Sequence, residues 1–423
     1  MTYRMIKIAV LTLCVALGTY SNLFTIIAFL ICCALIVFDK ESLYVMLFLH
    51  PFSTIFNLSP TGMSLMTILI ILYVIIDIIK YQRMDSYFFV IYVLFVLFAL
   101  LLSINHLEFT RIIKFFTGFL FVYYALEDAK RLEIKEILLH FILGMIVSSA
   151  LAYFDVLHNL SAYFPEQNTL GYAFGYATRF SGLHADPNYY SVNTTICLCF
   201  LVFLGVNQMM KPPTQLLLAA PLIVFCFLTL SKSAVLSLAI VLLVLILYYF
   251  KTGAYKKAIG MIGLSAVGIV LLFSLDIPAV TTILTRFQVS DDLNSLTTGR
   301  FDLWKMYLHY ITTDLKVFFF GRGICADFLS KAVHNTYLDC WYYLGIVGSF
   351  LLVCLCVVLN KNTTNGKKNI INFSVFLCIL VMYFALSELF YFDFPIHLLL
   401  GSLIYRAPMH SQKDENRIHQ KAV

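Results

Sequence analysis

Long apolar segments recur along the whole chain and constrain its fold more than any other feature. An α-helix needs about 20 apolar residues to cross a bilayer, and most of the segments are that long or nearly so. A membrane β-barrel would need alternating apolar and polar residues, but runs such as "VLLVLILYYF" do not alternate. The sequence therefore predicts an all-α polytopic membrane protein. The apolar segments are 5–18, 22–38, 43–59, 63–80, 87–104, 110–126, 137–155, 189–206, 214–230, 233–250, 257–275, 336–359, 370–389 and 392–406.

Because the first three segments and the last are short, we expect about twelve to fourteen transmembrane helices. The composition agrees, with 61% hydrophobic and only 12% charged residues. The N-terminal stretch "MTYRMIKIAVLTLCVALG" resembles a signal peptide, but no cleavage site followed by a soluble domain appears. We therefore interpret it as the first spanning helix and expect one transmembrane domain over residues 1–423.

Basic residues predict which loops face the cytoplasm, because lysine and arginine are retained there. If the N-terminus is cytoplasmic and the helices alternate, the loops "KYQRMDS", "EDAKRLEIKE" and "KTGAYKK" all fall on the cytoplasmic side. The basic tail 407–423 falls on the same side, so both termini are predicted to be cytoplasmic. Two long connections, 156–188 and 276–335, are then extracytoplasmic, and loops of this length are usually functional or disordered.

The remaining basic residues fall on the outer side, most of them in the loop 276–335. Long loops escape the charge rule, so these residues leave the topology intact. Two interpretations stay open, namely a solvated loop with snorkelling side chains and an anion site on the outer face. The residues are Arg111, Lys114, Arg179, Lys232, Arg286, Arg300, Lys305, Lys316, Arg322 and Lys331.

Two outer motifs surround a helix start and a tight turn. In "TRFSGLHADPNYYS", the Asp-Pro-Asn element at 186–188 predicts the start of a helix, and Arg179 lies just upstream. In "TLSKSAVLS", a serine is expected to cap the next helix, with Lys232 at its mouth.

Two further motifs lie in the second long loop. The apolar spacing in "TTGRFDLWKMYLHY" predicts an amphipathic helix at the membrane surface, with Arg300 at its start. In "GRGICADFLSKAVHNTYLDCWYYLGIVGS", two glycines allow a tight bend around Arg322, and His334 and Asn335 end the loop where the next helix begins.

These residue types suit a lipid-linked phosphate or pyrophosphate. Arginine offers a rigid fork of donors for phosphate oxygens, and lysine adds a point charge. A histidine of near-neutral pKa could take a proton from an attacking hydroxyl while arginines stabilise a departing pyrophosphate. The outer location excludes nucleic acid as a partner, and no phosphate-binding Gly-rich loop indicates a nucleotide donor.

No metal or other cofactor is expected. Asp291-Asp292 is a lone acidic pair, and the eleven cysteines lack metal-ligand spacing, so we interpret them as small hydrophobes.

Each candidate also has an ordinary explanation. A histidine at a helix end is commonly a cap or an interface residue, and Lys232 could snorkel. His50, His106, His140, His158 and His184 are assigned to that ordinary class. For Glu388, Asp393 and His397, a functional role and a structural pair with an outer arginine both stay open.

In order along the chain, "RFSGLHADPNYYS", "LTLSKSAVL", "TTGRFDLW" and "HNTYLDCWYYLGIVGS" resemble the signatures of the O-antigen polymerase and ligase superfamily (Wzy and WaaL). The resemblance covers about residues 175 to 350. It implies a GT-C-like fold. It also implies an enzyme that transfers a glycan from undecaprenyl pyrophosphate at the outer face of the bacterial inner or plasma membrane.

The resemblance also implies roles for particular residues. It assigns functional roles to Arg179, Arg300 and His334, with Arg322 as a further candidate. The family turn usually reads Ser-Arg, whereas this chain has Ser-Lys at Lys232, which keeps the charge and loses the bidentate fork.

The predicted function is polymerisation of undecaprenyl-pyrophosphate-linked repeat units of O-antigen, capsule or a similar surface polysaccharide, without a metal. In the expected mechanism, His334 deprotonates a sugar hydroxyl that attacks the anomeric carbon, and the pyrophosphate leaves with inversion. A chain-length regulator and a flippase of the same pathway are expected partners.

Three alternatives remain. One is a ligase that transfers the glycan to a lipid A core, and another is a non-catalytic membrane partner. The third is a flippase, although the halves show no internal repeat of the kind found in transporters.

Overall fold

The structure is a computed structural model, and a small part of the chain lies outside it. It describes residues 2–56, 64–82, 84–104, 109–154, 156–157, 169–172, 175–184, 186–274, 281–285, 297, 299–324, 333–361, 370–387, 389 and 393–407. Several sequence predictions fall outside these residues. They concern His106, His158, Arg286, Asp291, Asp292, Cys325, Lys331, Glu388 and most of the tail 407–423.

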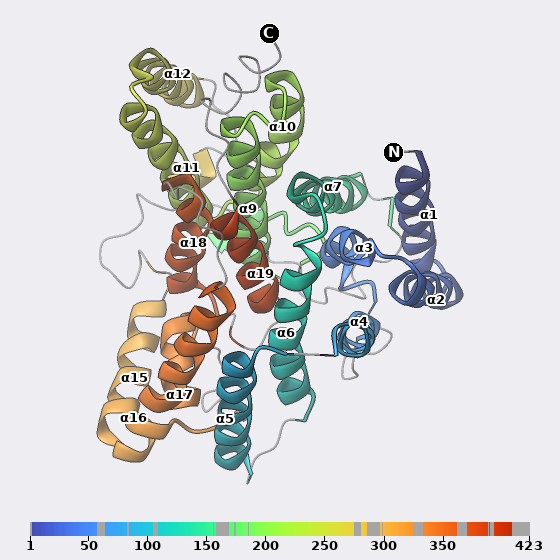
Figure 1. The fold of residues 1–423 in the computed structure, drawn as a ribbon. Coiled ribbons are helices and arrows are strands. Elements are labelled where there is room, and N and C mark those ends of the chain that lie inside the picture. The colour runs from blue at the N-terminus through green and yellow to red at the C-terminus, as the bar shows by residue number, and fades with distance from the viewer. Residues whose placement is uncertain are drawn as a thin grey trace.

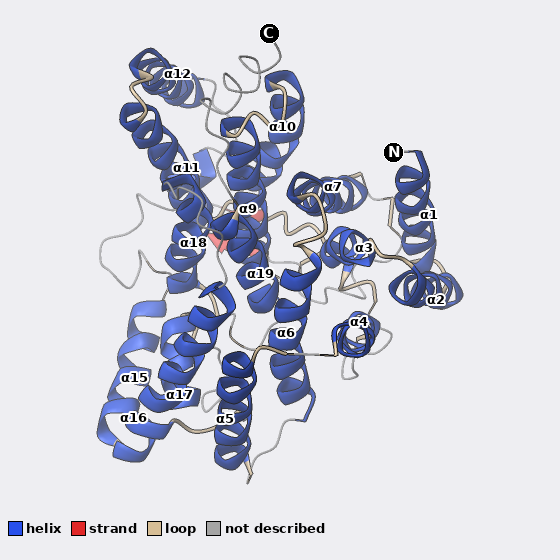
Figure 2. Cartoon of the chain, viewed as in Figure 1, coloured by secondary structure: helices blue, strands red, loops and turns tan. Residues whose placement is uncertain are grey.

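The described chain is almost entirely helical, as the sequence predicts (Figures 1 and 2). The first half contains α1 (Thr2–Gly18), α2 (Asn22–Phe38), α3 (Ser42–Leu49), η1 (His50–Phe52), α4 (Leu65–Tyr81), α5 (Ser86–Ser103), α6 (Phe109–Asp128) and α7 (Ile134–Tyr153). The second half contains α9 (Pro187–Val206), α10 (Pro212–Leu228), α11 (Lys232–Lys251), α12 (Tyr255–Ser274), α15 (Arg300–Thr313), α16 (Leu315–Phe320), α17 (Thr336–Lys361), α18 (Ile370–Met382), η2 (Tyr383–Ala385) and α19 (Asp393–Arg406).

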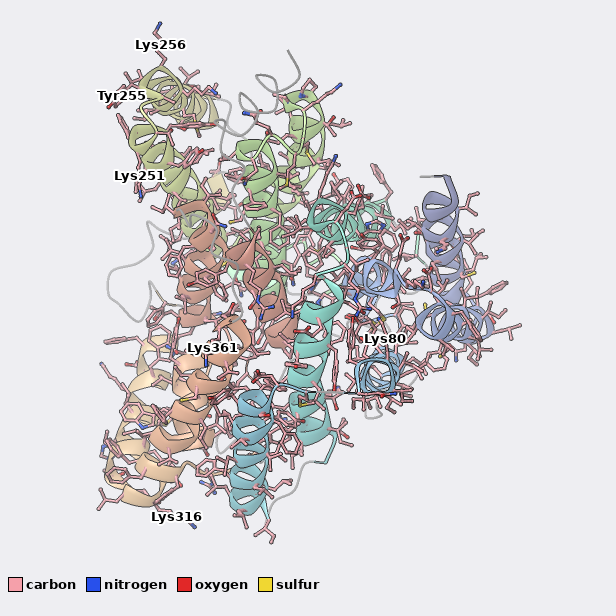
Figure 3. The ribbon with its side chains drawn as sticks, in the orientation of Figure 1. Lys80, Lys251, Tyr255, Lys256, Lys316 and Lys361 are labelled. Atoms are coloured by element: carbon pink, nitrogen blue, oxygen red, sulfur yellow. The ribbon has the colours of Figure 1, made fainter. Side chains whose placement is uncertain are left out.

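Within the described residues, five helices are long and apolar enough to cross a membrane, namely α5, α7, α9, α11 and α17. Five further apolar helical segments are shorter, in α1, α2, α3 with η1, α10 and α18. These helices confirm the prediction of an all-α polytopic membrane protein. Figure 3 places Lys251, Tyr255 and Lys256 at one end of the view and Lys316 at the other, with Lys80 and Lys361 between them.

Local sequence explains where the elements differ from the predicted segments. The segment 43–59 is not one continuous helix, because Pro51 has no N–H to donate and the chain turns through η1. The first long loop contains a hairpin that the sequence did not predict. Its strands β1 (Thr169–Tyr172) and β2 (Gly175–Thr178) pair antiparallel.

The amphipathic helix predicted in the second loop is α15, followed by the short α16. The apolar side of α15 buries Tyr307 and Ile311. The described cysteines are free thiols, as expected.

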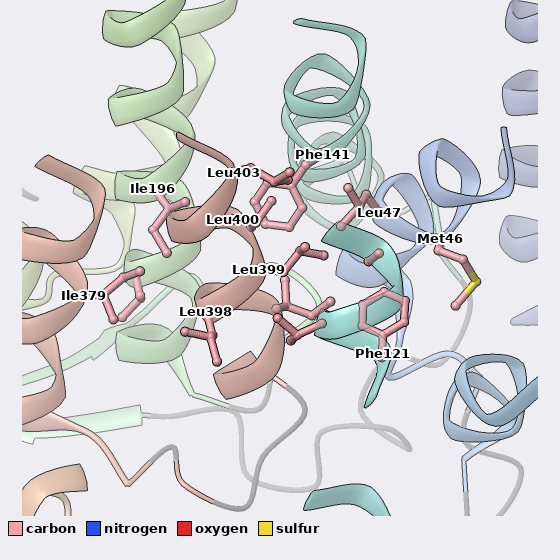
Figure 4. Packing of buried hydrophobic residues seen from close by; sticks show 14 of the residues in the cluster. Met46, Leu47, Phe121, Phe141, Ile196, Ile379, Leu398, Leu399, Leu400 and Leu403 are labelled. Carbon is pink, nitrogen blue, oxygen red and sulfur yellow. The ribbon is translucent and has the colours of Figure 1, made fainter. Parts of the chain in front are cut away.

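The core is centred on α19, which is buried on several sides because its apolar residues surround the helix (Figure 4). In Figure 4, Leu398 lies toward Ile379 of α18, and Leu400 and Leu403 lie toward Phe141 of α7. The core therefore joins the C-terminal helices to α6, α7 and α9.

Candidate functional site

Arg179 is held at the end of the first long loop by acceptors from two other segments. Its Nε donates to the Thr229 carbonyl at 2.7 Å, and its Nη2 donates to Asn188 Oδ1 at 3.0 Å. The side chain is only 8% exposed. The Phe180 amide adds a bond to the Leu228 carbonyl at 2.9 Å. Arg179 thus ties the loop to the start of α9 and to the turn between α10 and α11.

The α10–α11 turn is bound to the same asparagine. Ser231 Oγ donates to Asn188 Oδ1 at 2.7 Å, and it accepts the Ala234 amide as the N-cap of α11. The prediction of a serine cap is confirmed. Lys232 follows as the first residue of α11, so the turn brings its backbone next to Asn188. Leu230 has a φ of +50°, a left-handed conformation that is uncommon for leucine.

His334 is fixed from both sides in a strained backbone conformation. Its φ is +52°, and a non-glycine residue in this region costs of order 1–3 kcal/mol. Before it, Trp304 Nε1 of α15 donates to the Val333 carbonyl at 3.1 Å. After it, Asn335 Oδ1 caps α17 by accepting the Tyr337 and Leu338 amides at 3.0 and 3.1 Å.

Two charged groups act on the His334 imidazole. Burial lowers the pKa of His334 below its ordinary value, Arg300 lowers it further, and Asp186 opposes this effect. Arg300 is the first residue of α15. Asp186 is the N-cap of α9 and accepts the Asn188 amide at 2.6 Å. Asp186 therefore connects the His334 side of the site to the Arg179 side.

Sequence reasoning missed Asp186 as a site residue and treated it only as a helix start. The same carboxylate can serve as cap and as electrostatic partner, because a cap uses only part of its hydrogen-bonding capacity. The one available signal was an acidic residue in the motif that also carries Arg179.

Arg322 is fixed against α15 and α17. Its Nη1 donates to the Tyr310 hydroxyl at 2.7 Å, and its backbone amide donates to the Tyr342 carbonyl at 2.9 Å. That carbonyl is accessible because α17 breaks at Gly345, with a φ of +62°. Gly321 packs so closely on the break that a Cβ on it would lie 2.5 Å from the Gly345 amide nitrogen. The tight bend predicted around Arg322 is therefore confirmed, and the break in α17 is part of its structure.

A second polar cluster, largely buried, was not predicted. His50 Nε2 lies 2.8 Å from Asp393 Oδ1. Asn193 links two histidines, with Nδ2 3.0 Å from His184 Nε2 and Oδ1 3.0 Å from His397 Nε2. We refer to these five residues as the histidine cluster.

The cluster decides one of the alternatives left open by the sequence, because Asp393 pairs with His50 rather than with an outer arginine. His184 is coupled to this pair through its electrostatics. Burial lowers the pKa of His184 to about 4, an effect that the Asp393 carboxylate opposes. Within the part of the chain that the structure describes, no group of three or more His, Cys, Asp or Glu side chains is placed to hold a metal ion.

Residues 217–353 match a protein-family model described as O-antigen ligase. The matched region runs from α10 into α17, so it includes Lys232, Arg300, Arg322 and His334 and begins after Arg179. No curated protein and no solved structure matches the chain. Members of the family are glycosyltransferase-like enzymes of the membrane, with lipid-linked glycan substrates. The match covers less than half of the chain, so it shows that the region from α10 to α17 is similar to the O-antigen ligase family.

Proposed function

We propose that the protein polymerises undecaprenyl-pyrophosphate-linked oligosaccharide repeat units at the outer face of the bacterial inner membrane. The observation that carries this proposal is that His334, in the family-matched region, is half-buried at the start of α17 and is acted on by the charges of both Arg300 and Asp186.

His334 is the proposed general base. A lowered pKa keeps the imidazole neutral at neutral pH, so it can accept a proton. The hydroxyl oxygen of the acceptor sugar bonds to the anomeric carbon of the growing chain, and its proton passes to His334. The bond from that carbon to the pyrophosphate oxygen breaks with inversion. Arg300 stabilises the negative charge on the departing pyrophosphate, which makes a metal unnecessary in this mechanism.

The other predicted residues receive different proposed roles. Arg179 already donates to Thr229 and Asn188, so we assign it to holding the turn that presents Lys232 to the pyrophosphate. The oxygen of Asn335 is used by the α17 cap, which leaves its amide nitrogen as the group that would contact the glycan. Arg322 donates to Tyr310 and would in this way hold α15, which begins with Arg300, in place. Both termini are proposed to be cytoplasmic, with a chain-length regulator and a flippase as partners.

A ligase is the second candidate, because the matched family model is described as O-antigen ligase. A ligase would use the same donor and the same leaving group, and it differs in its acceptor, which is a lipid A core.

The test is the length of surface polysaccharide in a strain that lacks the protein and is complemented with His334→Asn. Asparagine tolerates the left-handed backbone and cannot act as the base. His309→Asn, on the exposed side of α15, is the matched control. Single-repeat material with His334→Asn and normal ladders with the control support the polymerase. Long but unattached chains indicate a ligase, and normal ladders from both variants overturn the catalytic role of His334.

A further inference from the structure

The starts of α9 and α17, which belong to the two sides of the candidate site, are joined by one short segment. Tyr189, in the first turn of α9, donates its hydroxyl proton to the Ser387 carbonyl at 2.9 Å. Thr336, two residues after the proposed base, donates to the neighbouring Leu386 carbonyl at 2.6 Å. Residues 383–387 therefore connect the two helix starts, and we refer to them as the bridging segment.

A chain of hydrogen bonds leads from the bridging segment to His184. The Tyr383 hydroxyl lies 3.1 Å from His397 Nδ1, and His397 Nε2 lies 3.0 Å from Asn193 Oδ1. Asn193 Nδ2 lies 3.0 Å from His184 Nε2. Because Asn193 Nδ2 also donates to the Tyr189 carbonyl at 3.4 Å, the orientation of its amide is fixed. Each member of the chain therefore donates to the next, and His184 is the final acceptor.

The final bond requires a neutral His184, because a protonated imidazole has no lone pair with which to accept it. Burial lowers the pKa of His184 to about 4, and the groups that act on its charge are Asp393 and His50. Asn193 and His397 are completely buried. Since water cannot replace their partners, the bonds hold the chain in one arrangement.

The loop before α9 is held in place around His184. On the other side of it, Thr54 Oγ1 donates to the Leu183 carbonyl at 2.6 Å. Asp186 follows His184 by two residues, and the helix cap occupies its Oδ1. The bond to His184 thus fixes the backbone just before the cap, and the direction of that backbone decides where the second carboxylate oxygen lies.

We propose that His184 and Asn193 are positioning residues that hold the Asp186 carboxylate toward His334. The bridging segment fixes the start of α17, and the hydrogen-bonded chain fixes the loop before α9. The inference rests on the proposed function, in which His334 is the base. Asp186 raises the pKa of His334, so variants that release the loop are expected to lower that pKa.

The test measures the pKa of His334 in the purified protein in nanodiscs. Diethyl pyrocarbonate modifies the neutral form of imidazole, so the rate of His334 modification against pH, followed by mass spectrometry of the peptides, gives this pKa. We expect Asn193→Ala and His184→Leu to lower it, in the same direction as Asp186→Asn. The acid limb of kcat/KM should move to lower pH in the same variants.

Two further variants control for the chemistry of the substitutions. His184→Gln is the conservative variant, because the glutamine amide oxygen can accept the Asn193 proton, and it should retain the wild-type pKa of His334. Asn207→Ala is the matched control, since Asn207 is a buried asparagine at the other end of α9 that donates to the Phe203 carbonyl. Partial unfolding would move the His334 pKa in the opposite direction, toward its ordinary value of 6.5.

A double variant decides whether the effect passes through Asp186. If it does, Asn193→Ala should produce no further shift when it is added to Asp186→Asn. A full additional shift in the double variant overturns the inference. A wild-type His334 pKa in both Asn193→Ala and His184→Leu also overturns it.

The modification of His334 does not depend on polymer formation, so the two proposals can fail separately. Polymer from the wild-type protein combined with an unchanged His334 pKa in the variants overturns the positioning role alone. The expected pKa shifts without polymer from the wild-type protein support the positioning role and overturn the proposed function.

Discussion

Arg179 and Arg300 lie in the two halves of the candidate site and are held in different ways. Arg179 is nearly buried and donates to Thr229 and Asn188. Arg300 is half-buried at the start of α15, and its charge lowers the pKa of His334. A buried arginine with protein acceptors organises segments, whereas a cation beside a neutral imidazole is suited to chemistry. Motif resemblance gives both residues the same role, and from their different surroundings we propose different roles.

The largest expected effect comes from Arg300. We expect Arg300→Gln to lower polymerisation turnover about 10²- to 10³-fold, the usual cost of losing a group that stabilises transition-state charge. The amount of folded protein should stay at the wild-type level. Turnover per folded molecule is the measurement, and unchanged turnover with less folded protein would make Arg300 a structural residue like Arg179.

Arg179→Lys should show the opposite pattern. Lysine cannot reproduce both bonds of the guanidinium fork, and loss of a charge-assisted bond costs about 2 kcal/mol. We expect a lower Tm in detergent and a smaller change in turnover per folded molecule. A wild-type Tm combined with a large loss of turnover would place Arg179 among the reacting groups.

The pH dependence of the reaction tests the Asp186–His334–Arg300 arrangement. The neutral imidazole is the active form, so kcat/KM should fall as the pH drops through the His334 pKa. Asp186 raises that pKa, so Asp186→Asn should move the acid limb to lower pH while asparagine keeps the helix cap. Arg300→Gln should move the limb to higher pH in its residual activity. Shifts in the same direction for both variants would contradict the assigned geometry.

The histidine cluster predicts a stability effect. His184 takes up a proton at about pH 4 in the folded state, compared with its ordinary value of 6.5. Because the unfolded chain then binds the proton more tightly, stability should fall as the pH drops from 6.5 toward 4 and should change little above 6.5. Tm measured across this range checks the effect. His184→Gln should flatten the dependence, and an unaltered slope would assign it to other groups.

The smallest effect is expected at Asn335. Asn335→Ala removes the cap of α17 and should cost about 1 kcal/mol, whereas Asn335→Asp should retain the cap. If Asn335→Asp keeps its Tm and still loses turnover, the amide nitrogen contacts substrate. Full activity of this variant would leave Asn335 with the cap alone.

Local patterns in the sequence predicted much of the fold. The helix α15 follows from the apolar spacing after Arg300, and the start of α11 follows from its serine cap. Pro51 shows a limit of the same method, since the apolar segment around it continues although the helix does not. Hydropathy records the burial of a segment and not its backbone path.

The sequence by itself determined that the chain is helical and membrane-embedded, and it proposed His334 and Arg300 as site candidates, because periodicity, charge and ordered motifs are local properties. Only the tertiary structure decided that Asp393 pairs with His50, 343 positions away, and that Asp186 acts on His334. These pairs depend on how distant helices pack around α19, and hydrogen bonds across such distances leave no periodic signal in the chain.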